Sequence, residues 1–294
     1  MARSRRDDEI PHGPLHAILI CATLVTLYPV LWVITLACSG KQTLAIADMP
    51  PDPTFFDRLR AVIPWPQHWS FSSFVSVMTD QPFARWLLNS IIVATLTTIV
   101  GVFFSCTAAY AFSRFKFRGR RAGMMALLVS QMFPGTLMLI PLYIIVVQVL
   151  GLGSTRLGLV MVYATTSIPF SAWMLKGYFD TIPKELEEAA LIEGASVGQI
   201  FWRIVLPLAK PAVAITALFS FMTSWNEFIL AATFMDKEDM YTAPVGLRFF
   251  VGGFQQQWGY FAAGSIIVSI PIVFLFLYLQ KYLVSGLTAG SVKG

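Results

Sequence analysis

Charged side chains are scarce in this sequence. Asp, Glu, Lys and Arg make up 13% of the 294 residues, whereas a soluble domain carries about twice that fraction. Hydrophobic residues make up 56%, and no long polar block remains that could form a second, soluble domain. The composition therefore predicts a polytopic membrane protein. We expect its net charge of +5 to follow membrane topology rather than to serve a nucleic-acid partner.

Other scarce residues argue against several kinds of site. The three cysteines all lie in apolar runs, which favours packing roles over disulfides or metal binding. The three histidines lie near the start of the chain and in the first polar connection, so they do not indicate the clustered site of a membrane-embedded enzyme. The Gly-x-x-x-x-Gly-Lys-Ser/Thr pattern that cradles phosphates is missing. We therefore expect no catalytic residues, no metal and no cofactor bound by this chain.

Long apolar runs, by contrast, fill most of the sequence. An apolar helix needs roughly 20 residues to cross a bilayer, and six of the runs reach or nearly reach that length. The first run is too long for a signal-peptide core and is expected to remain as a span. The sequence therefore predicts an all-α, six-span domain over residues 15–284, between a short N-terminus (1–14) and a tail (285–294). The predicted spans are residues 15–38, 86–112, 122–149, 157–175, 208–234 and 259–284.

The polar connections indicate how the chain is oriented. The long connections are residues 39–85, 178–207 and 235–258. If the N-terminus lies inside, about two thirds of the 21 Lys and Arg residues fall on the cytoplasmic side, as the positive-inside rule favours. Both termini and residues 178–207 are therefore predicted to be cytoplasmic, and the other two long connections extracytoplasmic.

Prolines are predicted to break three of the spans. Pro134-Gly135 and Pro141 lie in the third span, Pro169 in the fourth and Pro271 in the sixth. Broken helices leave backbone groups that neighbouring helices or a watery cavity must satisfy. Each proline alone could equally produce a simple packing kink, but together they favour a central translocation pathway.

One acid stands out inside the predicted spans. Ionisable residues at membrane depth are candidates for function, and Glu227 is essentially the only one, with Asn226 and Gln131 as its main polar companions. Glu227 could line a translocation pathway, pair with a partner subunit, or be a structural acid whose hydrogen bonds are satisfied near a helix break. The sequence leaves these three alternatives open.

A polar, helix-prone stretch at residues 187–207 interrupts the apolar sequence. Gly194 lies where a left-handed helix cap is expected, and Ser196 with Gln199 forms a capping box that starts a second short helix. Leu206-Pro207 is predicted to end that second helix. Small residues on this bend would allow another backbone to approach closely, which suits a docking element.

The same stretch carries a family resemblance. Its spacing resembles the EAA loop of ABC-importer permeases, and Trp225 to Phe228 is similar to a run in the maltose-type sugar permeases. The resemblance implies the type I importer permease fold and a cytoplasmic loop that couples to an ATPase. The residues that match the loop, and that are expected to contact the ATPase, are Glu188, Ala189, Ala190, Gly194, Ile204, Leu206 and Pro207.

Two further segments extend the resemblance to the six-span subunit of maltose/maltodextrin/trehalose importers. The tail, residues 283–294, resembles the C-terminus of that subunit, although Ser291 stands where a further glycine is expected. The resemblance implies that Thr288, Ala289, Gly290, Lys293 and Gly294 reach the ATPase dimer. The loop at 235–258 is expected to touch a sugar-binding protein through Gly252, Gly253, Gln255, Gln256, Gln257 and Trp258.

The resemblance implies a subunit that moves a sugar from an extracytoplasmic binding protein into the cytoplasm by alternating access. Its expected partners are a second permease subunit, two ATPase subunits that bind ATP and Mg, the binding protein, and the lipid of a bacterial or archaeal inner membrane. An ion-coupled secondary transporter is the alternative. One intramembrane acid and no evident repeat argue against it.

Overall fold

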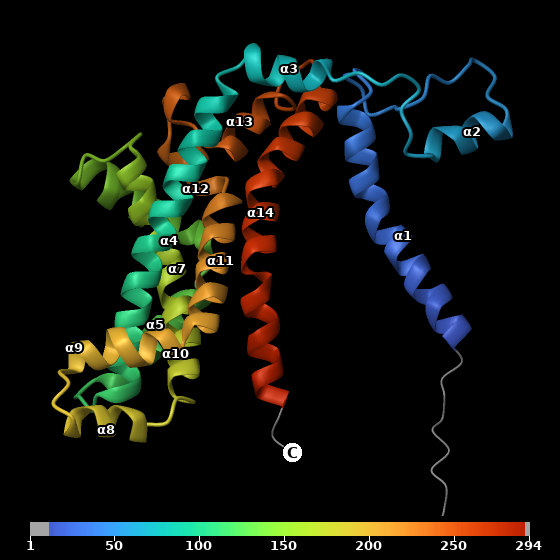
Figure 1. Ribbon diagram of the computed structural model, residues 1–294. Helices are drawn as coiled ribbons and strands as arrows, with labels where there is room; N and C mark the ends of the chain where they lie inside the picture. Colours follow the sequence, from blue (N-terminus) through green and yellow to red (C-terminus); the bar gives the residue numbers. More distant parts are fainter. Residues whose placement is uncertain (1–11, 292–294) are drawn as a thin grey trace, which may run out of the picture. The chain divides into compact units, whose positions relative to one another are not determined.

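The computed structural model describes the backbone of residues 12–291 and the side chains of residues 13–281. Regular structure within residues 12–291 is entirely helical, which confirms the all-α prediction (Figure 1). The chain divides into two compact units, one formed by residues 1–81 with 247–267 and the other by residues 82–246 with 268–294.

The first unit contains a helix that is apolar on every side. This helix, α1 (His12–Ala37), includes an 18-residue window in which no residue is buried. Such a surface requires lipid or another protein around it. Two shorter helices follow, α2 (Phe55–Val62) and α3 (Ser72–Thr79), and the Gln42 carbonyl accepts a hydrogen bond from Trp258 N at the start of α14 (Trp258–Ser291).

The second unit is built on three helices that pack together: α4 (Phe83–Arg114), α7 (Arg156–Phe179) and α11 (Lys210–Trp225). All three come close together at Gly101. A Cβ atom on Gly101 would lie 3.2 Å from Ser167 Oγ on α7 and 3.4 Å from Ser220 Oγ on α11. Small residues at this point let the three backbones come together, as is common between membrane helices.

Four helices of the described chain are long and apolar enough to cross a membrane: α1, α4, α7 and α14. Two bent pairs bring the count to six if each pair is one span. The first joins α5 (Arg120–Met132) to α6 (Gly135–Tyr143) and the π-helical η1 (Ile144–Val149), with a bend of 103°. The second joins residues 197–208 to α11 with a bend of 80°.

The helix breaks correct part of the sequence-based prediction. The third span does break at Pro134-Gly135, but Pro169 and Pro271 lie inside the continuous helices α7 and α14, and Pro141 lies inside α6. A proline removes only one backbone hydrogen bond, and packed neighbours or local adjustments make this tolerable in a membrane helix.

The fifth predicted span is likewise not one helix. The predicted run of residues 208–234 divides at residues 226–228, between α11 and the separate helix α12 (Ile229–Phe234). At this break, the Glu227 side chain accepts hydrogen bonds from backbone amides in the first turn of α12.

Candidate functional site

A sharp bend between two short helices forms the first candidate site. Helix α8 (Glu185–Ile192) ends at Gly194, which has φ +84°. Gly194 N donates to the Leu191 carbonyl and Ala195 N to the Ala190 carbonyl, the paired hydrogen bonds of a left-handed helix cap. The predicted cap is therefore confirmed. No atom lies within 4 Å of a Cβ placed on Gly194, so glycine is required here by its conformation and not by crowding.

The second helix of the bend begins as the sequence predicts. Helix α9 (Val197–Ile200) starts with a capping box in which Ser196 and Gln199 each bond the other's backbone amide. The helix then continues through the π-helical η2 (Phe201–Val205) and α10 (Leu206–Leu208). It ends at Ala209, so Leu206-Pro207 does not end it. Pro207 instead lies within this continuing helical run, as the second residue of α10.

A buried ion pair attaches α8 to the end of α4. Glu187 is 8% exposed, and its carboxylate accepts a hydrogen bond from Arg114 Nε and another, 3.1 Å long, from Tyr110 OH. The Arg114 guanidinium also donates to the Ile182 carbonyl at 3.0 Å. Removing one partner of a buried pair leaves an uncompensated charge, so this contact holds the bend firmly against α4.

A second contact joins the end of α4 to the end of α7. Asp180, which follows α7, accepts a 2.6 Å hydrogen bond from Ser113 Oγ and pairs with Lys176. Burial would raise the pKa of Asp180, but hydrogen bonds from Lys176 and Ser113 outweigh burial and lower the pKa below its ordinary value. The carboxylate is therefore charged at neutral pH, and it links α4 to the end of α7.

The residues that match the EAA loop fall into two groups. Glu188, Ala189, Gly194 and Pro207 are exposed. The other three are wholly or partly buried in the core beneath the bend, in contact with α4 and α7. These three are Ala190, Ile204 and Leu206.

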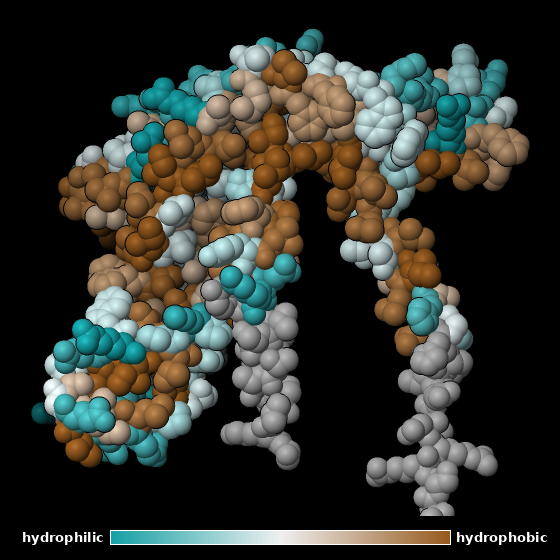
Figure 2. Space-filling model, viewed as in Figure 1, coloured by the Kyte–Doolittle hydropathy of each residue, from teal (hydrophilic) through white to brown (hydrophobic). Residues whose placement is uncertain are grey.

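Large apolar side chains surround the exposed group, and sequence reasoning missed them. Ile192 is 89% exposed, an unusual state for an isoleucine at a helix end. In Figure 2 hydrophobic atoms lie among hydrophilic ones over the region of α8 and α9. An apolar patch of this kind indicates a protein contact. We define the coupling surface as Leu186, Glu188, Ala189, Leu191, Ile192, Gly194, Val197 and Trp202, all of them exposed.

Glu227 lies at the break between α11 and α12 and is half-buried. Its carboxylate accepts hydrogen bonds from Tyr163 OH at 2.9 Å, Leu230 N at 2.8 Å and Ala231 N at 3.0 Å. It therefore caps the N-terminus of α12, where a negative charge is favourable. Asn226 and Gln131 are exposed, and no hydrogen bond joins either of them to Glu227 within the described residues. These contacts favour the structural alternative for Glu227.

A second polar network, which sequence reasoning also missed, lies at the opposite end of α4. Asn89 is fully buried and donates to the carbonyls of Asp239 and Tyr241, at 3.0 and 2.9 Å. Its own carbonyl accepts a 3.0 Å bond from Arg156 Nε. The sequence signal that could have revealed this network is the amide side chain of Asn89 within an apolar helix. This network fixes the loop around η3 (Glu238–Met240) over the ends of α4 and α7.

The loop expected to meet a sugar-binding protein lies between α13 (Ala243–Phe249) and α14. Gly252, Gly253, Gln255 and Gln256 are exposed, and so is Phe254 between them, while Gln257 and Trp258 are half-buried. In the tail, Thr288, Ala289 and Gly290 belong to helix α14, whereas Lys293 and Gly294 lie outside the described residues. Within the described part of the chain no group of His, Cys, Asp and Glu could hold a metal ion.

Comparisons with known proteins agree on one family. Residues 101–289 match the family described as "Binding-protein-dependent transport system inner membrane component". The trehalose/maltose transport system permease protein MalG of Thermococcus litoralis is 37% identical over 279 residues, which are 94% of each chain. The galactooligosaccharides transport system permease protein GanQ of Bacillus subtilis is 34% identical over 281 residues, 95% of this chain and 94% of that one.

Structural comparison supports the same assignment of fold. A chain from the crystal structure of a bacterial ABC transporter involved in the import of the acidic polysaccharide alginate superposes with a TM-score of 0.76. It is 24% identical in sequence, and the match covers 96% of this chain and 99% of that one. By the family match and by its relatives, this chain belongs to the family of binding-protein-dependent transport system inner membrane components, the permease subunits of ABC importers.

Proposed function

We propose that the chain forms, with a second permease subunit, the membrane pathway of an ATP-driven sugar importer. In this proposal an extracytoplasmic binding protein delivers the sugar, two partner ATPase subunits bind ATP and Mg, and both termini of the chain are cytoplasmic. The membrane is the inner membrane of a bacterium or archaeon. The observation that carries the proposal is the coupling surface, where apolar side chains are displayed on a bend that a buried ion pair attaches to α4.

Coupling follows from how the bend is attached. An ATPase subunit that closes on ATP would press on the coupling surface, which rests on α4 through Glu187 and Arg114. Because the pair is buried, α8 and α4 would move together rather than slide past each other. The motion would pass to α7 and α11, which pack on α4, and would open the pathway alternately to each side of the membrane. We assign residues 288–294 of the tail a further contact with the ATPase subunits.

Each unit presents a surface that suits a binding protein. In the first unit the exposed loop at residues 252–256 offers an aromatic ring and amide groups. Such groups suit a protein that carries a sugar, since they stack on rings and bond hydroxyls. In the second unit the network around Asn89 holds the exposed residues 236–238 in place.

We further propose an oligosaccharide of the maltose, maltodextrin or trehalose kind as the transported sugar. The proposal rests on the tail, on the run from Trp225 to Phe228 and on relatives whose names carry these sugars. Another relative of similar identity is named for galactooligosaccharides, so uptake assays should compare both kinds of sugar.

The coupling role is tested by Ile192→Asp. Ile192 is almost fully exposed, so the substitution should leave the fold intact while placing a charge in an apolar contact. We expect normal amounts of the variant in the membrane, loss of the copurified ATPase and loss of sugar uptake. The control is Val62→Asp, the same kind of change at an exposed position of α2. Normal ATPase binding and uptake by the Ile192 variant would refute the proposal.

Uptake assays in cells that express the wild-type chain distinguish the energy source. An ATP-driven importer should continue uptake in the presence of a protonophore as long as ATP is maintained, and should stop when ATP is depleted. The opposite result would favour the ion-coupled alternative.

A further inference from the structure

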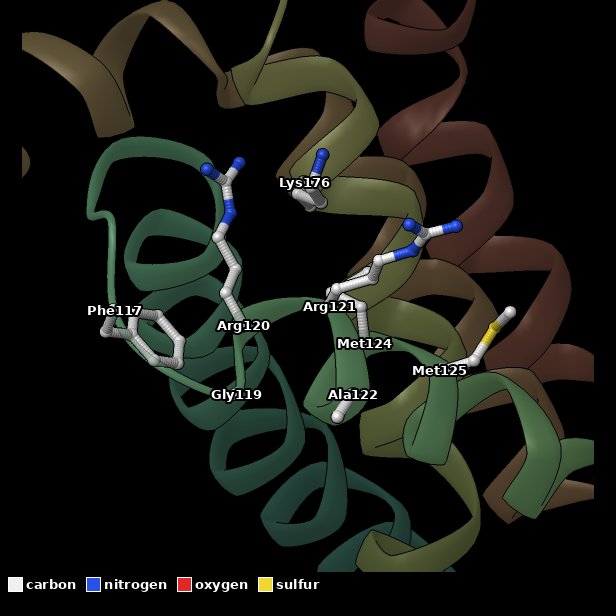
Figure 3. A pocket seen from close by; sticks show the side chains of 8 residues that line it. All are labelled: Phe117, Gly119, Arg120, Arg121, Ala122, Met124, Met125 and Lys176. Atoms are coloured by element: carbon white, nitrogen blue, oxygen red, sulfur yellow. The ribbon is translucent and has the colours of Figure 1, made fainter.

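A basic pocket at the start of α5 plays no part in the proposed coupling. It has a volume of about 900 Å³ and lies between the α4–α5 connection, the first turns of α5 and the end of α7. In Figure 3 the charged ends of Arg120 and Lys176 point the same way, and that of Arg121 lies on the other side of Lys176. The remaining lining residues are Phe117, Gly119, Ala122, Met124 and Met125.

The charge of the pocket is largely uncompensated. Lys176 pairs with Asp180, but neither Arg120 nor Arg121 forms an ion pair with an acidic residue of the described chain. Both arginines also stand in the first turn of α5, where the helix dipole is positive and acidic residues are normally favoured; this turn has none. Cations gathered at a positive helix end repel one another unless an anion lies among them.

An apolar strip continues from the pocket along α5. Met125, Leu128, Val129 and Met132 follow at helical spacing, and all four are exposed, with Met132 at 81%. No residue of α5 is buried in the described chain, while Gly123 approaches the ring of Phe112 on α4. A ligand on this face would therefore meet cations first and then an apolar surface running into the depth of the membrane.

We propose that this pocket binds the phosphate-bearing headgroup of an anionic phospholipid, with an acyl chain lying along the apolar strip of α5. Under the orientation proposed above, the site faces the cytoplasmic leaflet, where anionic lipids attract basic groups and basic pockets between spanning helices bind their headgroups. A free phosphate would match the cations but would leave the apolar strip uncovered. A phospholipid fits both the basic pocket and the apolar strip of α5, whereas a free phosphate fits only the pocket.

The test uses the full-length chain, with whatever partners copurify, in nanodiscs of phosphatidylcholine that contain a minor fraction of phosphatidylglycerol. Retained lipid is identified by native mass spectrometry, and the Kd for a fluorescent phosphatidylglycerol is measured. Arg120→Gln with Arg121→Gln should weaken binding about 25-fold, at roughly fivefold for each basic residue. The matched control is Lys116→Gln with Arg118→Gln, two exposed basic residues of the same connection that do not line the pocket. It should change the Kd less than about threefold.

Further measurements separate the lipid from other occupants. Met125→Gln should also weaken phosphatidylglycerol binding several-fold, because it removes apolar contact without changing charge. Glycerol phosphate should not displace the lipid. Equal losses in the two double variants would show diffuse attraction and overturn the proposal. Full displacement by glycerol phosphate would overturn it in favour of a soluble phosphate. A photo-crosslinker at position 121 that labels a protein partner instead of lipid would also overturn it.

Discussion

The buried pair between Arg114 and Glu187 allows the sharpest test of coupling. Glu187→Gln removes the negative charge while keeping the shape of the side chain, and it leaves the Arg114 guanidinium, 7% exposed, without the carboxylate that it pairs with. Breaking such a pair costs about 3–5 kcal/mol, which would raise the population of a detached bend by roughly two to four powers of ten. We therefore expect faster proteolytic cleavage within residues 181–199, less copurified ATPase and lower sugar uptake.

Two matched variants decide whether the buried charge is the cause. Glu185→Gln makes the same chemical change on the same helix at an exposed position, and it should leave cleavage and uptake unchanged. Arg114→Met combined with Glu187→Leu removes both charges and should restore much of the stability, since apolar replacements of a buried pair are often neutral or better. If Glu187→Gln resists cleavage as the wild type does and transports normally, the reasoning about this pair is refuted.

The remaining predictions concern three other positions. Gly194→Ala should destabilise the bend by about 1–2 kcal/mol because of the positive φ, and Gly194→Asp should also lose ATPase binding while still inserting in the membrane. Gly198→Ala, at an exposed helical glycine with no neighbour within 4 Å, is its control and should be neutral or stabilising; equal effects at both positions would contradict the cap. Asn89→Leu should lose about 1 kcal/mol for each of its two bonds to loop carbonyls, and proteolysis of residues 235–242 checks this; unchanged cleavage would contradict it. Glu227→Ala should lower the thermal stability of the assembled complex more than Glu227→Gln does; a change in sugar preference at unchanged stability would instead support a pathway role.

Local features were predictable from the sequence because they depend on neighbouring residues. The cap at Gly194 and the capping box at Ser196 each involve backbone groups within five positions, and both are present in the structure. The all-α fold and the break at Pro134-Gly135 followed from apolar run length and from backbone chemistry.

Contacts between distant residues were not predictable in this way. Arg114 and Glu187 lie 73 positions apart, and each fits a simpler interpretation: a cation in a cytoplasmic connection and an acid in the first turn of a helix. The same applies to Asn89, which bonds carbonyls about 150 positions away. The sequence also predicted helix breaks at Pro169 and Pro271 that the structure does not contain. A helix tolerates proline when the neighbours that pack around it compensate for the lost hydrogen bond, and those neighbours are distant in sequence.

Helix α4 carries one polar network at each end, and this arrangement has a thermodynamic consequence. Asn89 and Arg114 are 25 residues apart on one continuous helix, a rise of about 38 Å. A ligand that shifts α4 from one end must change the affinity for a ligand at the other end, and by the same factor in both directions. Under the proposed function, if docking of the binding protein at one end of α4 tightens the attachment of the ATPase at the other, a tightly held ATPase must strengthen docking by the same factor.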